Sequence, residues 1–352
     1  MASRALLGIA VAAAALVTAS SQLASANEGT TSVDPTTLPR GARPQVPYLR
    51  TDTGVIHDGA RAVRVTIPGD LRFFADARDG YVLSGYPDAR KRHWLAVYHT
   101  DGHRRVLARA YDEIWNVTVA PGGGRVAYSV GGTNPTRIVI RRLSDGAVLA
   151  RRSFRRETRI VAFGTHRLLL AQGRSNFDTV TRWWRPGRTK LGVYANTGRA
   201  RAADLSAHQV EMAYSGSNTR MESIPRGAEP AWKVPQWWEM PGWSPDDRRI
   251  FFVSGLEDVD AWAYQQLDVV GRRGRELHRF TGWFAGVLED THALVWEDNR
   301  TFLVDAYTLG SDATLGRGAV VRCHVGGSCE RASAVFDVGG VRSLPYWLAP
   351  RV

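Results

Sequence analysis

The chain has 352 residues, of which 44% are hydrophobic, and its 46 basic and 34 acidic side chains give a formal net charge of +12 at pH 7. Only Lys91, Lys190 and Lys233 are lysines, and the arginines are scattered rather than striped, which argues against a nucleic-acid-binding protein. Beyond residue 30 no stretch is long and apolar enough to span a bilayer. Two interpretations of the charge remain open. It reflects either the arginine-rich coding of a GC-rich genome or attraction to anionic partners such as cell-wall polymers.

The N-terminus has the features of a secretory signal peptide over residues 1–26. Arg4 supplies the positive region, Ala5–Val17 is the apolar core, and Ala24-Ser25-Ala26 is typical of a cleavage site. We therefore expect export to the cell envelope or the medium after cleavage near Ala26. An uncleaved anchor is the alternative, although the apolar run is shorter than the ~20 residues that a membrane span needs. A lipid anchor is disfavoured because no cysteine lies near the cleavage site.

A segment poor in large apolar residues follows the signal peptide. The stretch from Asn27 to Pro47 contains four prolines together with Ser, Thr and Gly. Such a segment buries too little apolar surface to offset the entropy lost on ordering. The sequence thus predicts a flexible linker over residues 27–50 and a single folded domain over residues 51–352.

A short phrase returns about every forty residues through that domain. Its clearest copy is GWSPDDRRIFFV at 242–253, and weaker copies lie at 119–128 and 296–304. In each copy a polar turn separates an apolar stretch from a second apolar run. A repeat of this period, built from strand-turn-strand units, is the signature of a β-propeller. The second runs begin at Val82, Val126, Leu168, Val210, Ile250 and Phe302.

Each repeat continues with two further strands. In the second unit, residues 137–141 and 147–151 flank Ser144-Asp145-Gly146, and in the first unit Thr100-Asp101-Gly102 has the same place. Asp-Gly between two strand-like runs favours a tight hairpin, because that turn needs positive φ at its central residues. The sequence therefore predicts an all-β fold made of four-stranded antiparallel blades.

Segments at both ends of the domain are left outside the six repeats. Residues 55–67 resemble one hairpin and residues 335–347 another. A ring leaves no open sheet edge when its two ends contribute strands to one blade. We therefore favour seven blades, with the seventh built from both ends of the domain, over six.

The repeat phrase also supports a named resemblance. Gly242-Trp243-Ser244-Pro245-Asp246 and the residues that follow are similar to the Ser-Pro-Asp-Gly repeat of TolB-type, WD-repeat-like propellers, and Ala120-Pro121-Gly122-Gly123 is a degenerate copy. The resemblance implies the fold and a general expectation of binding. It differs from TolB in that no separate α/β domain precedes the repeats, and it implies neither the TolB partners nor a reaction.

The two cysteines, Cys323 and Cys329, flank a glycine-containing turn. In an exported protein such a pair is typical of a disulfide, here joining two adjacent strands. A zinc site would need a second pair of ligands, and only His324 is close in sequence.

Motifs for catalysis are absent from the sequence. It contains no G-x-S-x-G, H-E-x-x-H, EF-hand loop or G-x-x-x-x-G-K, and we predict no catalytic residue, metal or cofactor. His99 and His103 flank a turn, where solvated histidines are the simpler interpretation than a metal site. His57-Asp58 and Glu289-Asp290 with His292 are acid–base candidates if they face the channel, or else turn residues.

Two tandem tryptophan pairs are the candidate binding residues. Adjacent residues on a strand point to opposite faces, so we expect one tryptophan of each pair to be packed and the other exposed. Exposed tryptophan beside Arg or Glu suits carbohydrate stacking, cation–π contacts or a protein interface, and packing between blades is the alternative. We assign Trp115, Trp243 and Trp296 to packing. The candidates are Trp183, Trp184, Arg185, Trp237, Trp238 and Glu239.

Two functional hypotheses follow from these observations. The first is a secreted, monomeric, non-catalytic propeller that binds a protein or a cell-envelope polymer through the loops between its strands. The second is a propeller enzyme, a lyase or hydrolase acting on a glycan or lactone, with acid and base groups at the channel mouth.

Overall fold

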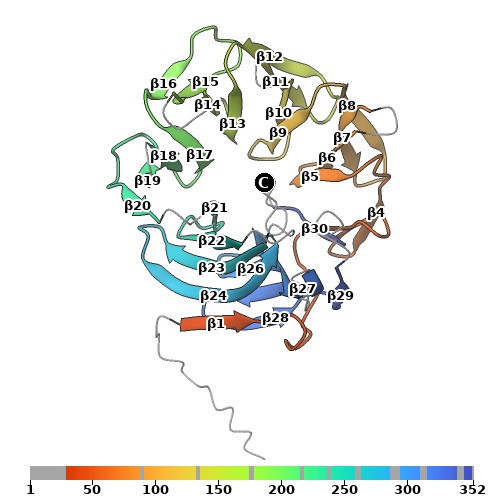
Figure 1. Cartoon of the computed structure of the whole chain (residues 1–352). Coiled ribbons are helices and arrows are strands. Elements are labelled where there is room, and N and C mark those ends of the chain that lie inside the picture. Colours follow the sequence, from red (N-terminus) through yellow and green to blue (C-terminus); the bar gives the residue numbers. More distant parts are fainter. Residues whose placement is uncertain are drawn as a thin grey trace, which may run out of the picture.

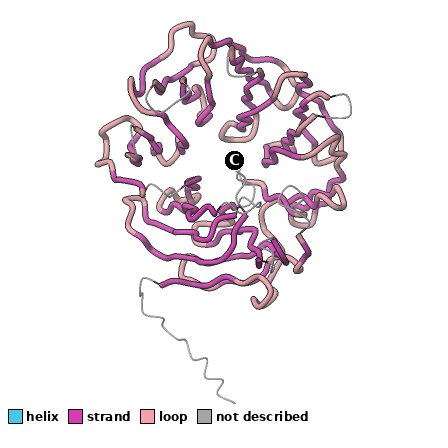
Figure 2. Tube along the Cα trace, in the orientation of Figure 1, coloured by secondary structure: helices cyan, strands magenta, loops and turns pink. Residues whose placement is uncertain are grey.

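A computed structural model describes residues 29–87, 91–131, 135–173, 178–214, 218–235, 239–257, 263–285, 294–309, 315–338 and 345–350 of the chain. The predicted signal peptide and five candidate residues, Trp237, Trp238, Glu289, Asp290 and His292, lie outside them. Strands and turns make up the described chain, arranged as a ring around a central axis (Figures 1 and 2). No helix in these ranges is long and apolar enough to cross a membrane.

The described strands group into seven blades, which confirms the all-β propeller prediction. The first four blades are separate four-stranded antiparallel sheets. The first contains β5 (Leu71–Ala77), β6 (Gly80–Gly85), β7 (His93–His99) and β8 (Arg104–Ala110), and the second contains β9 (Ile114–Val119), β10 (Arg125–Val130), β11 (Thr136–Arg142) and β12 (Val148–Phe154). The third contains β13 (Thr158–Phe163), β14 (Leu168–Gln172), β15 (Val180–Trp184) and β16 (Gly192–Ala195), and the fourth contains β17 (Arg199–Asp204), β18 (Gln209–Ala213), β19 (Thr219–Ser223) and β20 (Trp232–Val234).

The fifth and sixth blades are joined into one larger sheet, because β24 also pairs with β26. The fifth blade contains β21 (Glu239–Trp243), β22 (Arg249–Glu257), β23 (Ala263–Gly271) and β24 (Glu276–Ala285). The sixth contains β25 (Leu294–Trp296), β26 (Thr301–Leu309), β27 (Leu315–His324) and β28 (Cys329–Arg331).

The seventh, or closing, blade takes strands from both ends of the domain, as the leftover segments predicted. Its order is β30 (Tyr346–Leu348), β2 (Tyr48–Arg50), β3 (Val55–Asp58) and β4 (Arg61–Arg64), with Leu49 opposite Trp347. Within the described part of the predicted hairpin over 335–347, β30 joins this blade and β29 does not. Strand β29 (Phe336–Asp337) pairs instead with β27, and the Phe336 ring packs against Tyr307 and Tyr346.

The segment that the sequence predicted to be a flexible linker is instead ordered against the ring. Strand β1 (Gly29–Val33) pairs in parallel with β24, and β2 begins three residues before the predicted domain boundary. Apolar anchors are few, chiefly the buried Val33 and Val46. Hydrogen bonds also attach this segment to the ring. The Arg331 side chain donates to the Leu38 carbonyl, and the Arg322 side chain donates to the carbonyls of Ala42 and Arg43. Composition alone does not reveal such backbone contacts.

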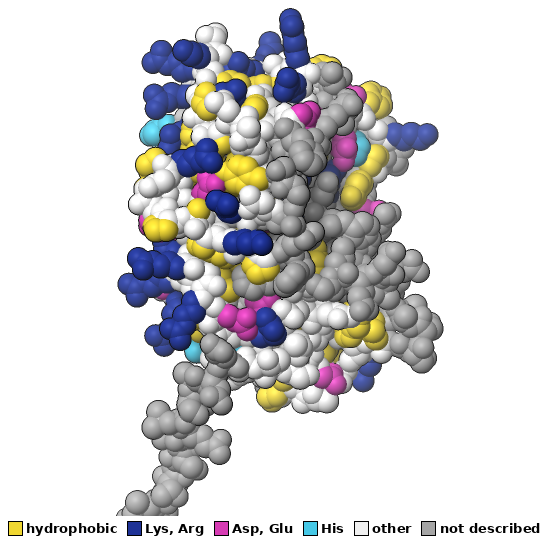
Figure 3. All heavy atoms as spheres, turned by 60° about the vertical axis from the view of Figure 1, so that its left-hand side comes forward, with side chains coloured by type: hydrophobic (Ala, Val, Ile, Leu, Met, Phe, Trp, Pro, Cys, Tyr) yellow, Lys and Arg dark blue, Asp and Glu magenta, His cyan; other side chains and the backbone are white. Residues whose placement is uncertain are grey.

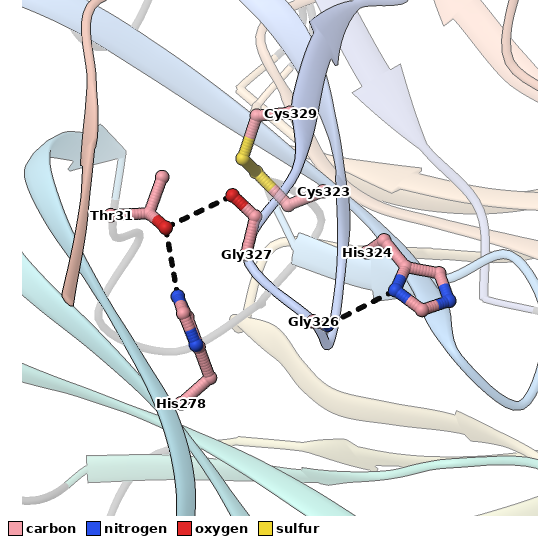
Figure 4. Close-up of a disulfide and its surroundings, with 7 residues drawn as sticks. All are labelled: Thr31, His278, Cys323, His324, Gly326, Gly327 and Cys329. Carbon is pink, nitrogen blue, oxygen red and sulfur yellow. Dashed lines mark hydrogen bonds between the residues drawn. A yellow bond between two sulfur atoms is a disulfide. The ribbon is translucent and has the colours of Figure 1, made fainter. Parts of the chain in front are cut away.

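The predicted disulfide joins β27 to β28, with Cys323 opposite Cys329. Its hairpin also holds β1 (Figure 4): the Thr31 hydroxyl donates to the Gly327 carbonyl at 2.9 Å and lies 2.8 Å from His278 Nε2. Because the Thr31 proton is used on Gly327, the histidine must donate the second hydrogen bond. The turn therefore links the N-terminal strand to the fifth and sixth blades.

Large side chains fill the wedges between neighbouring blades. Between the second and third blades the buried Trp184 ring meets Phe154 edge to face, with centroids 6.0 Å apart. Aromatic pairs in this geometry contribute about 0.5–1.5 kcal/mol beyond their buried area.

Candidate functional site

The antiparallel order of each blade places two of its turns at the same end of the ring. These are the turn between the first and second strands and the turn between the third and fourth. We call this end the turn face. The repeat phrase occupies its inner turns, so the side chains that the phrase carries are displayed around the channel.

Arginines on the turn face link neighbouring blades. Arg78 donates from Nε to the Gly122 carbonyl of the next blade at 3.1 Å. Arg125 donates to the Thr165 carbonyl, and Arg249 Nη1 donates to the Asn299 carbonyl at 2.9 Å. Each contact joins an inner turn to the inner turn of the following blade. Part of the arginine content is therefore structural.

The clearest copy of the phrase forms its turn through its own side chains. Ser244 donates from Oγ to Asp246 Oδ1 at 2.7 Å, and the same hydroxyl accepts the Arg249 N–H. Asp246 also receives the Arg249 guanidinium at 3.2 Å. Serine and aspartate in this spacing replace backbone partners in a tight turn, which explains why the phrase encodes scaffold.

A second group of basic side chains surrounds the turn end of the third blade. We call it the third-blade basic patch and define it by Arg125, Arg152, Arg167, Arg185, Arg188 and Lys190. Arg167, Arg185, Arg188 and Lys190 are exposed, and Arg125 and Arg152 are half-buried. Within the described part of the chain none of the six forms an ion pair with a carboxylate. The charged groups of the patch are thus not neutralised by direct ion pairs.

Two contacts connect the segments that carry these residues. Arg152, on the outer strand of the second blade, donates to the Arg188 carbonyl of the third blade at 3.3 Å. Arg125 reaches Thr165, which lies two residues before Arg167. Figure 3 shows Lys and Arg side chains gathered along the margin of the ring that is at the left in that view.

Trp183 packs directly against one member of the patch, Arg167. The Arg167 guanidinium carbon is 3.9 Å from the centroid of the Trp183 ring, and Tyr194 meets the same ring edge to face at 6.3 Å. Trp183 is half-buried, whereas the adjacent Trp184 is buried in the wedge toward the second blade. The two rings occupy opposite faces of β15, as the strand geometry predicts. Trp184 is therefore core, and Trp183 and Arg185 remain as candidate surface residues.

The other candidates have separate positions. Glu239 begins β21, and its tryptophan neighbours lie outside the described residues. Trp296 is buried and Trp243 is half-buried, and both indole N–H groups are bonded, to Gly242 and Gln209 respectively. Their assignment to packing is thus supported by their contacts.

The described histidine candidates, His57, His99 and His103, lie in two different blades. His57 stacks on Tyr48 with ring centroids 5.0 Å apart, and burial lowers its pKa. His99 and His103 stack across their turn at 5.9 Å. Among the described residues no group of three His, Cys, Asp or Glu side chains is arranged to hold a metal ion.

Comparisons with known proteins identify the architecture. The β-propeller domain of the trilobed protease from Pyrococcus furiosus is similar over 80% of this chain and 86% of its own, at 8% identity and a TM-score of 0.54. The chain has a β-propeller fold. A functionally unknown protein from Desulfotomaculum acetoxidans is similar over 87% of this chain and 99% of its own, at 9% identity and a TM-score of 0.54.

More distant comparisons add no function. TolB from Acinetobacter baumannii matches 66% of this chain at 13% identity with a TM-score of 0.48, and the match spans 62% of TolB. The propeller domain of Cps50 (Swd1) from Myceliophteria thermophila matches 78% of this chain and 88% of its own, at 9% identity and a TM-score of 0.52. No family model and no curated protein sequence matches the chain.

Most of the third-blade basic patch was missed by sequence reasoning. Trp183 and Arg185 were found because they are adjacent in an unusual tandem motif. Arg125, Arg152 and Arg167 lie in three different turns or strands, 27 and 15 residues apart. No local pattern signals that such residues meet, and the uniformly high arginine content hides them further.

Proposed function

We propose that this protein is a binding propeller of the cell envelope or the medium, and that the third-blade basic patch binds an anionic cell-envelope polymer. One observation carries the proposal: six cationic side chains lie on connected segments of the second and third blades, one of them stacks on the half-buried Trp183, and none is paired with a described carboxylate. Uncompensated charge of one sign attracts anionic partners and speeds their association.

The type of side chain favours phosphate or carboxylate groups. Five of the six cations are arginines, whose planar guanidinium can donate two parallel hydrogen bonds to one phosphate or carboxylate. The charges come from three turns and from the outer strand β12, so they suit a partner whose anionic groups repeat along its length. The predicted export of the protein would bring it to polymers of that kind.

The test measures binding of the purified chain, beginning at Asn27, to inorganic polyphosphate and to polygalacturonate at increasing salt. The patch variant replaces Arg185, Arg188 and Lys190 with glutamine. The matched control replaces Arg248, Arg273 and Arg275, three exposed arginines of the fifth blade, with glutamine.

We expect the patch variant to lose at least about tenfold in affinity for one of the two polymers, equivalent to about 1.4 kcal/mol, and to show a weaker salt dependence. The control should change affinity far less. Equal losses in both triple variants would show that only net charge matters, and the proposal would then fail. Binding that is insensitive to salt would also contradict it.

A further inference from the structure

A separate pocket opens on the turn face where the closing, first and second blades meet. Its volume is about 320 Å³, close to the lower end of the range of about 300–1,000 Å³ for ligand pockets. Turns from three blades line it, so it exists only in the closed ring. The lining residues are Asp58, Arg61, Asp76, Ala77, Arg78, Gly80, Tyr81, Thr100 and Gly122.

The acidic side of the pocket is held by a buried tyrosine. Tyr81 donates from its hydroxyl to Asp58 Oδ2 at 3.0 Å, and its ring is 1% exposed. Burial, and then the hydrogen bond to Asp58, raise the pKa of Tyr81, so the hydroxyl stays protonated and keeps donating at neutral pH. Asp76 lines the same side, and its Oδ1 accepts the Ala77 N–H at 2.9 Å.

The basic groups come from the same two hairpins as the acidic ones, Arg61 from β3–β4 and Arg78 from β5–β6. Arg78 is positioned by its Nε bond to the Gly122 carbonyl, while Arg61 is exposed. Arg61 lies directly opposite Asp58 in the β3–β4 register. In the described structure Asp58, Arg61 and Arg78 form no ion pair with one another. Asp58, Arg61 and Arg78 therefore border the pocket without forming ion pairs with one another.

We propose that this pocket binds a small zwitterion, an amino acid or short peptide with free termini. Its ammonium group lies against Asp58, and its carboxylate against Arg61 and Arg78. A neutral sugar fits the lining less well, because the one aromatic lining residue, Tyr81, is buried and offers no ring face for stacking. The pocket does not share a residue with the third-blade basic patch, and this proposal does not depend on the polymer-binding function.

The experiment titrates the full mature chain with glycylglycine by calorimetry. Two blocked probes remove one charge each: N-acetylglycylglycine lacks the ammonium group, and glycylglycinamide lacks the carboxylate. Methyl glucoside serves as the neutral sugar. We expect glycylglycine to bind and each blocked probe to bind at least about tenfold more weakly, as the loss of one charge-assisted contact requires.

Variants then assign the two ends of the ligand. Asp58→Asn keeps an acceptor for Tyr81, and we expect it to weaken glycylglycine about tenfold while leaving N-acetylglycylglycine unchanged. Arg61→Gln, at an exposed position, should weaken the binding of glycylglycine and leave the binding of glycylglycinamide unchanged. Asp145→Asn, on a turn of the second blade outside the pocket, is the matched control.

Three results would overturn the proposal. One is the absence of glycylglycine binding to the folded wild-type chain, and another is equal binding of the free and blocked dipeptides. The third is binding of methyl glucoside that exceeds that of glycylglycine. If Asp58→Asn does not fold, the Arg61→Gln variant tests the proposal alone, by its binding of glycylglycine compared with glycylglycinamide.

Discussion

Arg167 lies over Trp183, with its guanidinium carbon 3.9 Å from the centre of the indole ring. Arg167 lies in the turn before β14 and Trp183 on β15, both in the third blade and 16 positions apart in the sequence. The stacking covers one face of a half-buried tryptophan with an exposed cation. It therefore makes a basic surface out of what would otherwise be an apolar one.

Replacing Arg167 should separate binding from stability. A cation–π contact at an exposed site contributes about 0.5–1 kcal/mol, so we expect Arg167→Gln to lower the free energy of unfolding by no more than that. The loss of affinity of Arg167→Gln for the anionic polymer should be larger than this loss of stability. Trp183→Ala, in contrast, should destabilise the protein by about 2–3 kcal/mol, because the half-buried ring also packs against Tyr194. Urea unfolding of both variants measures the difference.

Gly123 allows the inner turns of the first two blades to touch. Its φ is +66°, and a Cβ added there would lie 2.2 Å from the Arg78 backbone nitrogen. We expect Gly123→Ala to destabilise the fold by about 2 kcal/mol or more, from left-handed strain plus displacement of the Arg78 turn. Gly102→Ala is the control, since its φ is +84° but nothing lies within 4 Å. It should cost only about 1 kcal/mol, and equal losses would exclude the backbone contact as the cause.

Asp305 should make the stability of the ring depend on pH. Its side chain is 1% exposed, both carboxylate oxygens lack a hydrogen-bond partner in the described structure, and burial raises its pKa well above 3.8. The folded state therefore favours the protonated acid. The stabilisation that this preference gives is complete below pH 3.8. It is lost as pH rises toward the pKa of Asp305 in the folded protein.

The variant Asp305→Asn removes this titration while keeping the shape of the side chain. We expect the variant to gain stability relative to the wild type as pH rises from acidic to neutral. Thermal unfolding of both proteins over that range gives the difference. A difference that stays constant with pH would show that Asp305 does not titrate in the folded protein as proposed.

The disulfide should contribute a modest amount of stability. Cys323 and Cys329 are six positions apart, and closure of so short a loop accounts for about 2 kcal/mol in the chain-entropy model. We expect the double variant Cys323→Ser/Cys329→Ser to lose about that much. Hydrogen exchange should also show faster opening of β1, since Thr31 bonds to the Gly327 carbonyl inside the same hairpin. Protection of β1 equal to the wild type would contradict that link.

Interactions that are local in sequence were predictable. The forty-residue period, the Asp-Gly hairpins and the alternation of apolar residues each depend on a few neighbouring positions, so they predicted the blades. The pairing of Cys323 with Cys329 followed in the same way. The opposite directions of Trp183 and Trp184 follow from strand geometry alone, although which of the two is buried depends on the neighbouring blade.

Contacts between distant segments were decided only by the tertiary structure. The sequence by itself determined a ring of four-stranded blades with strands from both ends in one of them. It did not reveal that residues 29–47 lie along the ring, because backbone carbonyls accept hydrogen bonds from Arg322 and Arg331 whatever side chains that segment carries. Nor did it place Arg152 beside Arg188, or Asp58 beside Arg78 in one pocket. Such groups meet because the ring brings separate turns to one face. The spacing of residues along the chain does not indicate which turns become neighbours.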